Sequence, residues 1–130
     1  MATEFETAIF NEYENNLFHC QKIPMGRVDG VGENVDSEYG VVVVTLNMNP
    51  RDKQRIQDMY WSMPRGTRTI AAFSSMLARL AIGKTIEEAY AITYEDVATA
   101  NDMTWPDYMY WHTIAPMQAF RAALKHSKKR

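Results

Sequence analysis

Cysteine is almost missing from this sequence, because Cys20 is the only one in 130 residues. A single thiol excludes an intramolecular disulfide and any metal site built from the cysteines of one chain. We interpret Cys20 as a buried or inert thiol. The first ten residues, MATEFETAIF, lack the basic and apolar regions of a secretory signal. We therefore expect a cytoplasmic protein.

Long apolar runs and a strong net charge are also absent. No stretch of 18 apolar residues occurs, so we expect no membrane insertion. The net charge of −2 gives no reason to expect nucleic-acid binding. The basic tail, residues 125–130, is interpreted as a solvated helix end, with a docking role as the alternative. The composition, 46% hydrophobic and 23% charged, is typical of one soluble globular domain spanning residues 1–130.

The first half of the chain predicts one helix followed by strands. Thr3 and Glu6 have the spacing of a capping box that opens a helix over residues 3–17. Its predicted buried face contains Phe5, Ala8, Ile9, Phe10, Tyr13 and Leu17. We expect a short strand near residues 21–28 and a clear one, YGVVVVTLNM, over 39–48. A turn at Pro50 leads to a returning strand over 54–63, for which a helix is the alternative.

The second half of the chain predicts helices. Thr67 or Thr69 can cap a long helix that ends near Gly83, and Thr85 and Thr93 can each open a short one. A last helix begins near residue 113, with Pro116 in its first turn. Strands followed by helices indicate an α+β fold, a three-stranded antiparallel sheet with helices packed on one face.

Three motifs in order resemble the U-type iron–sulfur scaffold family, the IscU proteins and the N-terminal domain of NifU. Residues 13–15, YEN, resemble the family's H-Y-E-N-P. Residues 66–89 resemble its G-C-x-x-A-x-A-S-S-S-L…G-K-[ST]-x-x-E-A, and residues 106–123 its L-P-P-V-K-x-H-C-S-x-L-A. The resemblance covers nearly the whole chain and implies the same α+β fold.

The resemblance implies a site for a transient [2Fe–2S] cluster, held by three cysteines beside an aspartate, and this chain lacks all three thiols. The first cysteine position falls on Asp36 and the aspartate position on Glu38. The second falls on Thr67 and the third on His112. Only one proline of the chaperone-recognition motif is retained, at Pro106. We therefore expect no [2Fe–2S] cluster.

The substituted positions have a second interpretation. If the fold is correct, Asp36, Glu38 and His112 would converge, with Thr67 as a weak oxygen donor. Two carboxylates and an imidazole suit one Fe(II), Zn(II) or Mn(II) ion. The alternative is that these residues only fill a solvated rim where the cysteines were lost.

An aromatic stretch near the third ligand position is a candidate partner-binding surface. It consists of Trp105, Tyr108, Met109, Tyr110 and Trp111. Side chains of these types often anchor protein contacts, although ordinary packing onto the sheet is the alternative.

We expect a non-enzymatic scaffold homologue that acts as an accessory or structural subunit of a larger complex, which could contain metal or redox centres. In this interpretation it needs no cofactor, and its partners are proteins. The alternative is a mononuclear iron or zinc carrier or donor that uses Asp36, Glu38 and His112. An enzyme on this fold is a third and weaker interpretation.

Overall fold

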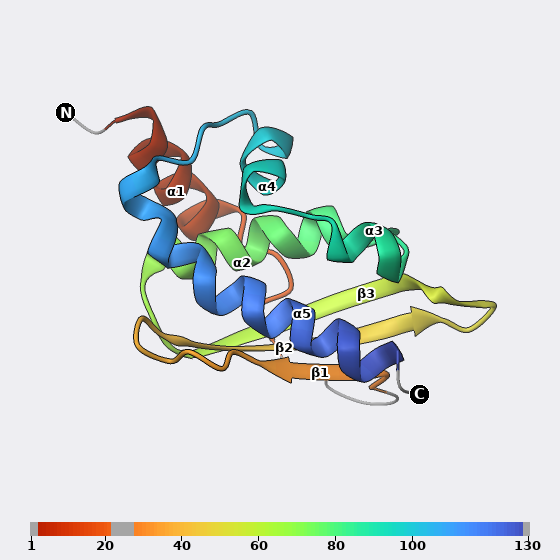
Figure 1. The fold of residues 1–130 in the computed structure, drawn as a ribbon. Helices are drawn as coiled ribbons and strands as arrows, with labels where there is room; N and C mark the ends of the chain where they lie inside the picture. Colours follow the sequence, from red (N-terminus) through yellow and green to blue (C-terminus); the bar gives the residue numbers. More distant parts are fainter. Residues whose placement is uncertain (1–2, 22–27, 129–130) are drawn as a thin grey trace.

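The computed structural model describes residues 3–21 and 28–128 and has an α+β fold. Three antiparallel strands form one sheet in the order β1-β2-β3. The helices lie over one face of this sheet, as predicted (Figure 1). The elements in chain order are α1 Glu4–Asn15, β1 Gly30–Glu33, β2 Val41–Asn49, β3 Asp52–Arg65, α2 Arg68–Ala81, α3 Ile86–Tyr90, α4 Tyr94–Ala100, the 3-10 helix η1 Asp107–Thr113, and α5 Ile114–Lys128.

Threonine caps fix the beginnings of four helices, at the positions that the sequence indicates. The Thr3, Thr67, Thr85 and Thr93 side chains each accept a hydrogen bond from a backbone N–H in the first turn of the helix that follows. For α3 and α4 the reciprocal bond is also present, in which the backbone N–H of the capping threonine donates to an acidic side chain in the first turn. At the end of the long helix, Gly83 has a φ of +91°, which a glycine adopts with little strain.

The sheet has one buried face. Along β2 the side chains alternate, and Val42, Val44, Leu46 and Met48 are buried against the helices. The returning strand predicted over 54–63 is confirmed as β3, but its side chains do not alternate without interruption. Asn47 pairs with Asp58 but Met48 pairs with Ile56, so β3 carries one extra residue there. This bulge turns Ile56 to the same face as Met59 and Trp61.

Helix α5 lies against β1 and β2 at very short range. A Cβ atom added to Gly32 would come within 2.2 Å of the Ala123 nitrogen and 2.4 Å of the Ala119 oxygen. The close approach of the two backbones therefore requires glycine in β1. It fixes where α5 and the preceding η1 begin relative to the sheet.

One prediction from the first part of the chain is not tested and another needs correction. The predicted strand near residues 21–28 falls on residues 22–27, which lie outside the described part of the chain, and the first described strand is β1, Gly30–Glu33. On α1, Phe5 and Ile9 are buried as predicted, but Phe10 is 55% exposed, and Leu17, which follows the end of α1 at Asn15, is 39% exposed.

Glu12 lies on the buried face of α1 together with Phe5 and Ile9, one turn further along the helix. It is 7% exposed, and Arg79 donates to both of its carboxylate oxygens, at 3.1 and 2.9 Å. The Ser75 hydroxyl donates to the same carboxylate at 2.5 Å. Paired in this way, a buried charge is tolerated between α1 and α2.

No helix among the described residues is long and apolar enough to cross a membrane.

Candidate functional site

Thr67 and His112, two of the predicted ligand positions, are in direct contact. Thr67 lies just before α2, and His112 lies near the end of η1. The Thr67 hydroxyl oxygen is 3.0 Å from His112 Nδ1 and also accepts a hydrogen bond from the Ile70 N–H at 3.2 Å. The Thr67 hydroxyl donates to Nδ1 when the ring proton is on Nε2, and it accepts from Nδ1–H in the other tautomer.

His112 is buried and neutral. Only 5% of its surface is exposed, and burial lowers its pKa to about 4. The adjacent Trp111 ring lies 3.5 Å from the imidazole, measured between ring centroids. The site therefore holds an uncharged imidazole whose Nδ1 is already hydrogen-bonded by a threonine.

Asp36 and Glu38 lie in the exposed loop between β1 and β2. Asn34 organises this loop: its side chain donates to the Asp36 and Gly40 carbonyls and accepts from the Val42 N–H. The Asp36 carboxylate accepts a bond from the Glu38 N–H at 3.1 Å, which is a local turn contact.

The same loop is fastened to the rest of the site by two further bonds. The Asp36 N–H donates to the Gln118 side chain on α5 at 2.8 Å. The Arg65 guanidinium donates to the Ser37 carbonyl. These bonds hold the loop beside η1 and α5.

The four predicted metal ligands are thus only partly brought together. Thr67 and His112 touch, whereas Asp36 contacts its own loop. Across residues 3–21 and 28–128, no three His, Cys, Asp or Glu side chains gather closely enough to hold a metal ion. The structure does not assemble Asp36, Glu38 and His112 into one ligand set, and metal binding by them stays a prediction.

The donor set does not fit a [2Fe–2S] cluster, because such clusters are held mainly by thiolates. None of the three ligand positions carries sulfur. Cys20 is exposed, and it lies beside β3, where its backbone pairs with Trp61. Desolvation raises the pKa of its thiol, which keeps it protonated at neutral pH.

Trp105, predicted to belong to the partner-binding surface, belongs instead to the core. It is 5% exposed, and its ring meets Phe5 and Phe73 edge-on at centroid distances of 4.8 and 5.2 Å. Its indole N–H donates to the Met109 carbonyl at 2.8 Å. Packing between α1 and α2 removes this tryptophan from the surface.

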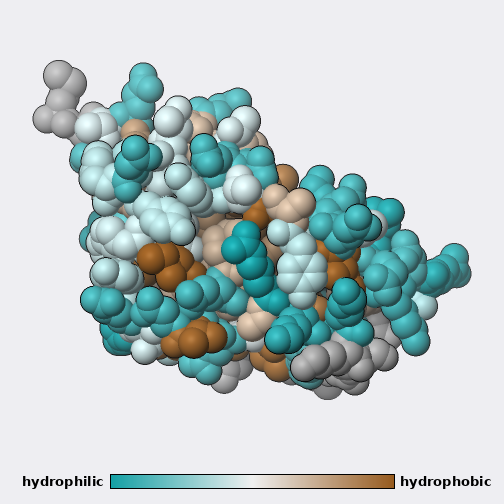
Figure 2. All heavy atoms as spheres, viewed as in Figure 1, coloured by the Kyte–Doolittle hydropathy of each residue, from teal (hydrophilic) through white to brown (hydrophobic). Residues whose placement is uncertain are grey.

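The other members of the aromatic stretch stay at or near the surface. Tyr108 and Tyr110 are 69% and 48% exposed, and Trp111 is half-buried, while Met109 packs partly against the core. Tyr39, which was not predicted, lies 5.1 Å from Trp111 between ring centroids. We call Tyr39, Tyr108, Tyr110 and Trp111 the aromatic surface. Figure 2 shows pale, weakly hydrophilic atoms over the half of the molecule that contains η1 and more strongly hydrophilic ones at the β2–β3 hairpin.

A second polar cluster was not predicted either. His19 Nε2 lies 2.9 Å from the Asp58 carboxylate, and the Tyr60 hydroxyl donates to the same carboxylate at 3.0 Å. The His19 ring stacks on Tyr60 and on Phe18. These contacts attach the segment after α1 to β3, with His19 at a φ of +58°. No local sequence signal pairs residues 39 positions apart.

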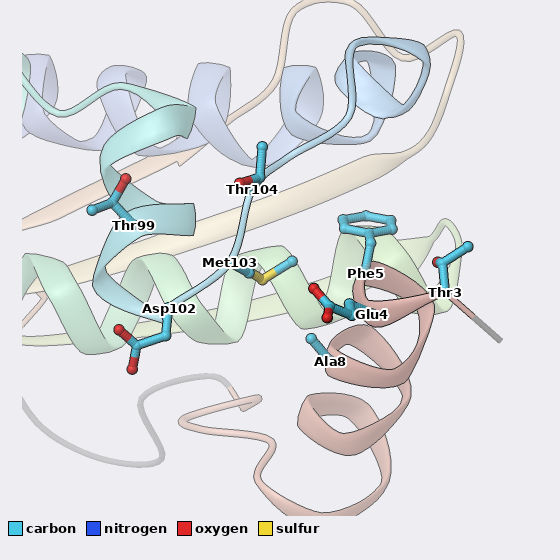
Figure 3. A pocket seen from close by; sticks show the side chains of 8 residues that line it. All are labelled: Thr3, Glu4, Phe5, Ala8, Thr99, Asp102, Met103 and Thr104. Atoms are coloured by element: carbon cyan, nitrogen blue, oxygen red, sulfur yellow. The ribbon is translucent and has the colours of Figure 1, made fainter.

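A hollow of about 650 Å³ lies between the first turns of α1 and the end of α4 (Figure 3). Two of its lining residues are acidic, Glu4 and Asp102. In Figure 3 the Asp102 side chain points away from α1, so the two carboxylates do not face each other across the hollow. This arrangement lacks the paired groups that acid–base catalysis would need.

Comparisons with known proteins agree with this fold. No curated protein matches the chain in sequence. The crystal structure of a nitrogen-fixing NifU-like protein (N-terminal) from Brucella abortus is similar, with a TM-score of 0.69 and 18% identity over 97% of this chain and 95% of that one. A putative iron–sulfur cluster assembly scaffold protein for the SUF system from Fervidobacterium islandicum AW-1 gives a TM-score of 0.66 and 16% identity over 95% and 96%. The model of the NifU-like N terminal domain matches residues 9–130, and the chain therefore belongs to this family.

Proposed function

We propose that this chain is a non-catalytic member of its family that serves as an accessory or structural subunit of a larger protein complex. The observation that carries the proposal is the Thr67–His112 hydrogen bond, 3.0 Å long, at two positions where a scaffold would offer thiolates. Neither a threonine hydroxyl nor an imidazole with its Nδ1 occupied replaces the soft sulfur ligands of a cluster. The fold is retained while the ligand set is not.

The aromatic surface supports a role in protein contacts. Tyr39, Tyr108 and Tyr110 are between 38% and 69% exposed, and they lie at the same end of the molecule as the Thr67–His112 pair. Tyrosine and tryptophan supply large contact areas and are enriched among residues that dominate binding energy. Packing of the core does not require these tyrosines to be exposed, so their exposure favours a partner that covers them.

The test is the size of the protein in its native source. Gel filtration of a native extract should place the chain in a complex much larger than its own 15.0 kDa. Tyr108→Ala and Trp111→Ala should weaken co-purification with the partner. Tyr90→Ala is the matched control, because Tyr90 is 37% exposed but lies on α3, away from η1 (Figure 1). A native protein that elutes as a free monomer would refute the proposal.

A further inference from the structure

Strand β3 has a free edge, because β2 lies on one side of it and no strand among the described residues lies on the other. With 14 residues, β3 is also much longer than β2, which has 9. A long edge strand presents backbone N–H and C=O groups with which a strand of another molecule can pair. Two copies of this chain would therefore be able to pair through β3 unless its edge is covered.

Contacts other than strand pairing cover the first half of this edge. The Ile56 N–H donates to the Lys84 carbonyl at 2.8 Å, and the Ile56 carbonyl accepts from the Gly83 N–H at 2.9 Å. In the middle of the strand, the Met59 N–H donates to the side-chain carboxylate of Asp58 at 3.1 Å. These bonds satisfy backbone groups of β3 without adding a strand to the sheet.

Further along β3, residues 18–20 cross the edge, and we call them the strap. The Trp61 N–H donates to the His19 carbonyl at 3.1 Å, and the Trp61 indole N–H donates to the Phe18 carbonyl at 2.7 Å. Cys20 pairs with Trp61 in an isolated parallel bridge. The strap therefore closes this part of the edge with one residue pair and not with a strand.

The side chain of His19 fastens the strap to β3. Its ring stacks on Phe18 and on Tyr60, at centroid distances of 3.8 and 4.6 Å, and its Nε2 lies 2.9 Å from the Asp58 carboxylate. The backbone of His19 has a φ of +58°, a left-handed conformation that is unfavourable for a residue with a Cβ atom. The surrounding contacts hold the strap in place against this strain.

Asp58 contributes twice to covering the edge, because one carboxylate holds His19 and also accepts from the Met59 N–H. We propose that the strap and Asp58 protect the edge of β3 and so keep two copies of this chain from pairing through it. When the strap is released, antiparallel pairing of β3 with β3 of a second copy joins the two sheets about a twofold axis. This role is independent of the subunit proposal, because it concerns a second copy of the chain and not the partner.

The double variant His19→Ala/Asp58→Ala tests this role. It removes the ion pair, the stacking of the imidazole and the side-chain cap on the Met59 N–H. In dilute solution, the Met59 and Trp61 amides of the variant should exchange their hydrogens at least about tenfold faster than those of the wild type, as NMR measures. In concentrated solution, the variant should sediment as a dimer and the same two amides should be protected again. The wild type should show neither change.

Thr93→Ala is the control, because Thr93 caps α4 and takes no part in the strap. This variant loses helix stability but should sediment like the wild type at both concentrations. If it dimerised as much as the double variant, lost stability and not an uncovered edge would cause association, and the inference would be overturned.

Two results for the double variant would also overturn the inference. One is exchange of the Met59 and Trp61 amides at the wild-type rates. The other is fast exchange in a variant that stays monomeric in concentrated solution. If the double variant does not fold, His19→Ala alone replaces it. That variant keeps the Asp58 cap, so Trp61 should exchange faster while Met59 should not, and an unchanged Trp61 amide would count against the strap.

Discussion

The Thr67 hydroxyl oxygen lies 3.0 Å from Nδ1 of His112, a buried imidazole whose pKa is lowered to about 4. The fold brings together residues 45 positions apart in the sequence. At the two positions where the resemblance to the scaffold family implies cluster ligands, the structure has a hydrogen-bonded pair without sulfur. The pair can therefore be tested by measuring the pH dependence of stability and the metal content of the protein.

The first prediction concerns pH. An ordinary histidine has a pKa near 6.5, so below that pH the unfolded chain takes up a proton that the folded chain refuses. The free energy of unfolding should be highest above about pH 6.5 and should fall as the pH decreases toward 4. The titration of His112 alone should lower it by about 2 kcal/mol between pH 7 and pH 5. Urea denaturation at several pH values measures this.

One variant isolates the contribution of His112 to that pH dependence. His112→Gln should reduce the loss of stability between pH 7 and pH 5. Identical pH profiles for the wild type and His112→Gln would show that the imidazole is not buried as described.

The second prediction concerns metal content. Protein purified without a chelating tag should contain well under one equivalent of iron or zinc, and His112→Ala should not change that value. Incubation with iron and sulfide should produce no [2Fe–2S] absorption, because no thiolate occupies the three ligand positions. Elemental analysis and visible spectra measure these outcomes. Stoichiometric metal that disappears in His112→Ala and Glu38→Gln would instead support the metal-carrier interpretation.

The third prediction concerns the contact between β1 and α5. Gly32→Ala should destabilise the protein by about 3 kcal/mol or more, or prevent folding, because the added methyl group would meet the α5 backbone at 2.2 Å. Gly83→Ala is the control. No atom lies within 4 Å of the added group there, so it should cost only about 1 kcal/mol for a φ of +91°. Chemical denaturation compares the two, and equal costs would contradict this packing.

Much of the fold could be predicted from local rules, because local rules govern its helix ends and its strands. The caps at Thr67, Thr85 and Thr93 depend on residues within one turn, and the four valines of β2 favour a strand by themselves. The bulge in β3 could not be predicted in this way. It is set by pairing with β2 and by the need to bury Ile56 beside Met59.

The candidate site also has features that could be predicted from the sequence and features that could not. Contact between Thr67 and His112 follows from the family fold, and the structure contains it. The Asp36 carboxylate was expected to point at the same centre, but a short side chain in a loop readily bonds the backbone two residues on, here Glu38. The exposure of Tyr39 depends on where η1 places Trp111, which no local pattern records.

The last prediction concerns the aromatic stretch over residues 105–111, which contributes one residue to the core and others to the surface. Trp105 and Tyr108 are three residues apart, yet one is 5% and the other 69% exposed. Trp105→Ala should destabilise the protein by about 3–5 kcal/mol, because it empties the space between Phe5 and Phe73. Tyr108→Ala should change stability by less than about 0.5 kcal/mol and should lower recovery of the partner. Denaturation curves and co-purification yields are measured on the same preparations. A Tyr108→Ala variant that is strongly destabilised, or a Trp105→Ala variant of wild-type stability, would reverse the assignment of core and contact surface.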